Sequence, residues 1–132
     1  MSTPEILLLA STIAFVTATI AMIYRDSRYT GGKWQISAAV GVIFLAFSLF
    51  VVAEEGLLGF WPVHTFDFWG SQVWIDLLIS LSIIWFLILP RAKQYKMNTG
   101  AWLLLVCCSG SIGMLAMLAR LIYLENQTTE SR

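Results

Sequence analysis

The sequence has little charge and no excess of either sign. Only 12% of the 132 residues are charged, eight basic against eight acidic, whereas 58% are hydrophobic and the mean hydropathy is +0.78. A water-soluble globule has more polar residues than this. Nucleic-acid binding lacks the basic excess that would hold phosphates, and intrinsic disorder is excluded by the large apolar content. We therefore expect a membrane protein.

Residues that form reactive or metal-binding sites are also scarce. The two cysteines, Cys107 and Cys108, are neighbours in an apolar run, so they do not form the C-x-x-C pair of a thiol oxidant. A single histidine, His64, provides neither a two-histidine haem site nor a closed metal site. The phosphate-loop, zinc-protease and nucleophile-elbow motifs do not occur. We expect no metal and no cofactor.

Charges are missing above all from four long apolar runs. Only two of the sixteen charged residues, Asp76 and Arg120, lie within them. A helix rises about 1.5 Å per residue, so each run can cross about 30 Å of hydrocarbon with modest adjustment at its ends. The pattern predicts an all-α polytopic membrane protein in which residues 1–132 form a single domain. Its four transmembrane helices are expected in an antiparallel bundle, at about 6–24, 36–53, 73–89 and 101–124.

Basic residues near the ends of the runs predict the orientation. The second connection, residues 54–70, has none, whereas the first and third have three each: Arg25, Arg28 and Lys33, then Arg91, Lys93 and Lys96. The positive-inside rule places these two connections in the cytoplasm. Both termini are then expected on the outside, N-out and C-out.

A polar cluster is expected in the outer half of the bundle. Asp76 lies about one turn inside the third run, and Arg120 about one turn inside the end of the fourth. Glu54, Glu55 and Gln72 are expected near the same level. A charge at membrane depth is costly unless it is paired, so we predict an ion pair between Asp76 and Arg120. The cluster either fixes helix register or lines an outward-facing pocket, and the sequence leaves both open.

The third run has two distinct faces. Its large residues share one broad face: Trp74, Leu78, Leu81 and Trp85. At 100° per residue, Asp76 lies about 200° from Trp74. We expect the large residues to meet lipid, and Asp76, Gln72 and Ser80 to point into the bundle.

The second connection is rich in aromatic residues. Such a segment is expected in the headgroup plane, as an ordinary aromatic interface loop, a lid over the polar cluster, or a docking edge for another membrane protein. The candidate interface residues are Trp61, His64, Phe66, Asp67 and Trp69.

The second half of the chain resembles a known family. The matching positions are Gln72-Val73-Trp74-Ile75-Asp76-Leu77-Leu78-Ile79, then Trp85, Arg91 and Gly100, then Gly110-Ser111-Ile112-Gly113 and Leu121-Ile122-Tyr123-Leu124. They are similar to a family of small bacterial membrane proteins known only as a domain of unknown function. The resemblance implies a bacterial inner membrane, with both termini periplasmic given the orientation above, and no defined activity.

Three functions fit these observations. The first is an accessory or hydrophobic-ligand-binding subunit, with membrane lipids and either another membrane protein or a second copy as partners, and no nucleic acid. The second is a small lipid or isoprenoid enzyme that uses Glu55 or Asp76 as acid and base. The third is a dimeric transporter. A cavity lined by Glu55 and Asp76 would favour the enzyme, whereas a filled core would favour the subunit.

Overall fold

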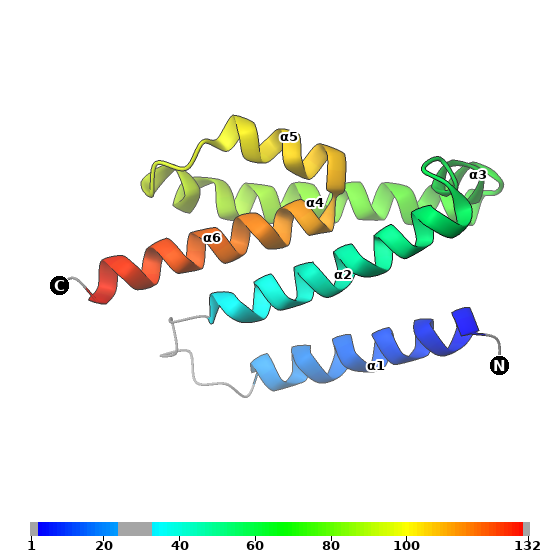
Figure 1. The fold of residues 1–132 in the computed structure, drawn as a ribbon, viewed down its shortest axis with the longest axis horizontal. Helices are drawn as coiled ribbons and strands as arrows, with labels where there is room; N and C mark the ends of the chain where they lie inside the picture. Colours follow the sequence, from blue (N-terminus) through cyan, green and yellow to red (C-terminus); the bar gives the residue numbers. More distant parts are fainter. Residues whose placement is uncertain (1–2, 24–32, 131–132) are drawn as a thin grey trace. The chain divides into compact units, whose positions relative to one another are not determined.

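The computed structural model describes residues 3–23 and 33–130, and the regular structure of this part of the chain is helical. The all-α prediction is confirmed. Contacts divide the chain into two units, Met1–Gly32 and Lys33–Arg132, and each is described by itself. The first contains α1 (Thr3–Ile23). The second contains α2 (Trp34–Glu55), α3 (Phe60–Thr65), α4 (Phe68–Gln94), α5 (Thr99–Ser109) and α6 (Ser111–Glu130), as Figure 1 shows.

The described part of the first unit is one apolar helix, α1. The hydroxyls of Ser11, Thr12 and Thr19 donate hydrogen bonds of 2.8 to 2.9 Å to backbone carbonyls about one turn earlier in α1. These polar groups are satisfied within the helix, which suits apolar surroundings. The connection that follows, including Arg25 and Arg28, lies outside the described residues.

Two described helices, α2 and α4, are long and apolar enough to cross a membrane. They contain the predicted runs 36–53 and 73–89, extend past both ends of each, and have 22 and 27 residues, or about 33 and 40 Å. The described apolar part of α1, Ile6–Ile20, and α5 are shorter. By length and composition, the described chain therefore has two candidate membrane spans where the sequence predicted four.

The predicted fourth helix, 101–124, is broken. Gly110 has φ 58° and ψ −123°, which ends α5 and turns the chain back into α6 (Figure 1). A side chain at this backbone conformation would be strained, so glycine is needed here. Gly113 lets the two helices approach, because a Cβ on it would lie 2.9 Å from the carbonyl oxygen of Leu105. The run is a helical hairpin, not one straight span.

The buried core of the second unit lies among α4, α5 and α6. It consists of Ile88, Ala92, Val106, Met114, Met117 and Leu121. On α4, Leu81 and Trp85 pack against this core, whereas Gln72, Asp76 and Ser80 are exposed. The predicted orientation of these α4 residues was therefore wrong. The reason is that Leu81, Trp85, Ile88 and Ala92 form one stripe at helical spacing, and the hairpin packs on that stripe.

The central helix of the second unit is α6, which contacts α2, α4 and α5. A Cβ on Gly41 of α2 would be 3.4 Å from the Cβ of Leu115, so the two helices approach closely there. Trp34 begins α2 and meets Tyr123 near the end of α6, with ring centroids 5.6 Å apart. The later part of α6 therefore lies beside the start of α2, as Figure 1 shows.

Candidate functional site

The second unit has opposite charges at its two ends. The start of α2, the end of α4 and the later part of α6 form one end, which we call the basic end. Its basic residues are Lys33, Arg91, Lys93, Lys96 and Arg120. The other is the acidic end, where α2 finishes and α4 begins, which carries Glu54, Glu55 and Asp67. The contact of Trp34 with Tyr123 and the ion pair described next bring the three parts of the basic end together.

An ion pair joins α4 to α6 at the basic end. The guanidinium of Arg91 donates to both carboxylate oxygens of Glu125, from Nε at 2.9 Å and from Nη2 at 2.7 Å. This two-point geometry fixes the orientation of both side chains. Because the side chains are 49% and 22% exposed, the pair contributes little to stability, about 0 to 1 kcal/mol. It aligns the hairpin with the end of α4.

The predicted pair between Asp76 and Arg120 is not formed. Arg120 lies at the basic end, with its guanidinium carbon 5.5 Å from the ring centroid of Tyr123. The ion pair between Arg91 and Glu125 marks a common level on α4 and α6. Asp76 lies fifteen residues before Arg91, or about 22 Å along α4. Arg120 lies five residues before Glu125, or about 7.5 Å along α6. About 15 Å therefore separates the levels of Asp76 and Arg120. The prediction assumed a straight fourth helix, which the break at Gly110 removes.

The other members of the predicted cluster do not meet Arg120 either. Glu54 and Glu55 are exposed at the end of α2, and Gln72 is exposed on the second turn of α4. The structure thus places the predicted acids in one half of the second unit and Arg120 in the other. It does not form the single level that the sequence suggested.

The aromatic connection between α2 and α4 is partly ordered by short contacts. Phe60 of α3 stacks on Trp74 of α4, with ring centroids 5.7 Å apart and planes at 20°. Asp67 caps α4, because its carboxylate accepts a hydrogen bond of 2.7 Å from the Gly70 N–H. Trp61, Phe66 and Trp69 are exposed, and the side chain of His64 is outside the described part. Of the predicted interface residues, Asp67 therefore has a structural role.

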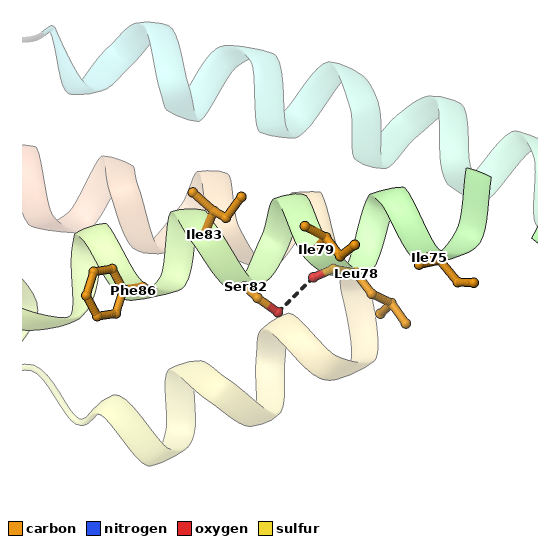
Figure 2. A pocket seen from close by; sticks show the side chains of 6 residues that line it. All are labelled: Ile75, Leu78, Ile79, Ser82, Ile83 and Phe86. Atoms are coloured by element: carbon orange, nitrogen blue, oxygen red, sulfur yellow. Dashed lines mark hydrogen bonds between the residues drawn. The ribbon is translucent and has the colours of Figure 1, made fainter. Parts of the chain in front are cut away.

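A shallow, open apolar groove of about 410 Å³ lies on one face of α4, with no second described helix lining it. Figure 2 shows its lining, all from α4: Ile75, Leu78, Ile79, Ser82, Ile83 and Phe86. The Ser82 hydroxyl donates a hydrogen bond of 2.8 Å to the carbonyl of Leu78, so it is satisfied by its own helix. The groove therefore offers an occupant almost purely apolar contacts.

Sequence reasoning missed Glu125 and the groove. Glu125 follows directly after the fourth apolar run, and Arg91 follows the third. Recognising the glycines Gly110 and Gly113 as a turn would have placed the two residues at the same end. The groove had no comparable signal, because an apolar groove and an ordinary lipid-facing stripe have the same composition.

Among the described residues, no three His, Cys, Asp or Glu side chains are grouped so that they could hold a metal ion. Cys107 and Cys108 are free thiols exposed on α5. Comparison with known proteins finds no matching family model, no similar curated protein and no similar solved structure. The resemblance of the second half to a bacterial membrane-protein family therefore gains no support from a family model.

Proposed function

We propose that the protein is an integral membrane protein in which α2 and α4 cross the bilayer. Two properties of α2 and α4 support this proposal. Both helices are long and apolar enough to cross a bilayer, and most of their large apolar side chains are exposed on the surface of the protein. Exposing so much apolar surface to water is unfavourable, whereas contact of the same surface with lipid acyl chains is not. Aromatic residues near the helix ends, among them Trp34, Tyr95, Trp69 and Trp74, fit the two interfaces.

The charge distribution supports one orientation of this arrangement. By the positive-inside rule, the basic end faces the cytoplasmic side of a bacterial inner membrane and the acidic end faces the outer side. Because α6 ends at the basic end, we place the C-terminus inside, in contrast to the exterior position predicted for a straight fourth helix. The exterior position predicted for the N-terminus depends on Arg25 and Arg28, outside the described residues, and remains a prediction.

The function best supported is non-catalytic binding of a lipid or similar apolar molecule, as an accessory membrane subunit. The observation that carries it is the groove on α4. It lies between Ile75 and Phe86 of a helix that begins at Phe68 and ends at Gln94, so its length of about 16 Å falls within the hydrocarbon layer. At that depth the abundant ligand with matching chemistry is an acyl chain. The enzyme hypothesis required a cavity lined by Glu55 and Asp76, and neither lines this groove.

Native mass spectrometry tests the proposal. After gentle extraction from membranes, we expect the wild-type protein to carry a lipid-sized adduct. Ser82→Phe should reduce that adduct strongly, because the added ring occupies the middle of the groove. Leu104→Phe is the matched control, since Leu104 is exposed on α5 and outside the groove.

The outcome that contradicts lipid binding at the groove is an adduct of equal abundance in Ser82→Phe and Leu104→Phe. A co-purified protein that Ser82→Phe releases, with no lipid adduct on the wild type, would instead identify the groove as a protein-docking face. Recovery of the wild-type protein in the soluble fraction without detergent would contradict membrane insertion itself.

A further inference from the structure

The basic end carries four cations that form no ion pair within the described residues. Glu125 neutralises Arg91. Lys33, Lys93, Lys96 and Arg120 are all exposed, and in the described part of the chain none of them has a carboxylate within salt-bridge distance. The described residues of this end therefore carry an excess of positive charge that their own carboxylates do not neutralise.

The cation of Arg120 is directed toward this end by aromatic contacts. Its guanidinium carbon lies 5.5 Å from the ring centroid of Tyr123, which follows it by about one turn. The Tyr123 ring in turn meets the Trp34 ring at 83°, beside Lys33. A guanidinium held over a ring keeps its N–H donors at its edge, where phosphate oxygens can accept from them.

The turn after α4 holds a lysine in a conformation that favours glycine. Lys96 has φ +54°, and its N–H donates to the carbonyl of Lys93 at 3.0 Å. The Met97 N–H donates to the carbonyl of Ala92, also at 3.0 Å, which completes the hydrogen-bond pattern of a Schellman motif. Glycine is the usual residue at this position, because a Cβ disfavours the left-handed conformation. The turn therefore carries an exposed charge at a position where glycine would be more stable.

The basic end also lies at the depth of lipid headgroups if α2 spans the bilayer. From Trp34 to Glu55, α2 covers about 33 Å, close to the thickness of the hydrocarbon layer. Trp34 and Tyr123, whose rings touch, are residues typical of the interface. Exposed lysines beside them are then in reach of phosphate groups.

We propose that the basic end binds the phosphate groups of anionic membrane lipids through Lys33, Lys93, Lys96 and Arg120. The inference rests on the proposed membrane insertion and adds the class of partner at this end. Charge complementarity selects anionic over zwitterionic headgroups, by about fivefold for each basic side chain at the surface. The acidic end, with Glu54, Glu55 and Asp67, repels the same headgroups.

The test compares lipids retained after reconstitution. The full chain is placed in vesicles of phosphatidylcholine with a minor share of phosphatidylglycerol, extracted gently, and its bound lipids are quantified by mass spectrometry. We expect phosphatidylglycerol to be enriched over its share in the vesicles. Lys93→Gln/Lys96→Gln should lower the enrichment at least about fivefold, Lys93→Arg/Lys96→Arg should retain it, and millimolar inorganic phosphate should not abolish it.

Glu54→Gln/Glu55→Gln, at the acidic end, is the control for overall charge and should leave the enrichment at the wild-type level or above. Equal enrichment in the wild type and in Lys93→Gln/Lys96→Gln overturns the proposal, as does its loss with inorganic phosphate, which indicates a free-anion site. Alkaline carbonate extraction distinguishes a failure of the lipid-binding inference from a failure of the proposed membrane insertion. A wild-type protein that stays in the membrane without enriching phosphatidylglycerol contradicts this inference alone, whereas a wild-type protein released by carbonate contradicts membrane insertion.

Lys96→Gly gives an independent readout. It should raise the melting temperature, since glycine suits the positive φ, and at the same time lower the enrichment of phosphatidylglycerol. A purely structural lysine would change stability without changing lipid selectivity, and that result would remove Lys96 from the site.

Discussion

Replacing Gly113 with leucine should prevent α5 and α6 from packing and destabilise the second unit severely. Even the first atom of a side chain, the Cβ, would lie 2.8 Å from the Ser109 hydroxyl oxygen and 2.9 Å from the Leu105 carbonyl oxygen. The carbonyl belongs to the backbone of α5 and cannot move without moving the helix. Overpacking typically costs about 1–3 kcal/mol, and we expect Gly113→Leu to reach or exceed the upper value. Thermal unfolding in mild detergent measures the loss.

Ala116→Leu is the matched control for Gly113→Leu, because Ala116 lies on the same helix three residues later and is exposed. It adds a similar volume at an exposed position. Equal melting temperatures for the two variants would show that the close approach at Gly113 is not what holds the hairpin.

Met117→Ala should also cause a large loss of stability. Met117 is fully buried, and among the described residues it and Leu121 are the largest side chains that are fully buried. Truncation leaves a cavity among α4, α5 and α6 that the surrounding helices fill only in part, and such changes cost about 2–5 kcal/mol. Leu104→Ala, at a side chain that is 67% exposed, should change the free energy of unfolding by less than about 0.5 kcal/mol. Equilibrium unfolding in a denaturing detergent compares them, and a Met117→Ala protein as stable as Leu104→Ala would contradict the packed core.

The sequence was sufficient to predict the helices that are determined by apolar composition and length. The runs 36–53 and 73–89 contain almost no charge, and both are helical in the structure. Helix ends were less accurate, because polar residues such as Gln35 and Gln94 can continue a helix at an interface. The orientation of α4 was predicted incorrectly for Leu81 and Trp85, since large apolar residues suit both lipid and a protein core.

The break at Gly110 was not predictable from hydropathy. Glycine is common in transmembrane helices, so a mainly apolar run of 24 residues with two glycines is predicted as one span. The consequence for the site was large, because the depth of Arg120 was counted along that span. A single residue with positive φ thus moves Arg120 from the level of Asp76 to the basic end.

The charge pattern, in contrast, agrees with the helix arrangement of the second unit. Lys33, Lys93 and Lys96 belong to two connections far apart in sequence, and the structure places them at one end. This grouping follows from the antiparallel course of α2 and α4. It did not require knowledge of the hairpin.

The central claim is that the second unit enters the bilayer with two crossing helices and a hairpin that returns the chain to the basic end. Labelling of single cysteines with a membrane-impermeant maleimide in sealed, oriented vesicles tests it most directly. In a background of Cys107→Ser/Cys108→Ser, the three variants are Gln127→Cys at the end of α6, Lys93→Cys at the basic end and Leu58→Cys near the acidic end. We predict that Gln127→Cys and Lys93→Cys react from the same side and Leu58→Cys from the other; reaction of Gln127→Cys together with Leu58→Cys, and opposite to Lys93→Cys, would contradict the account.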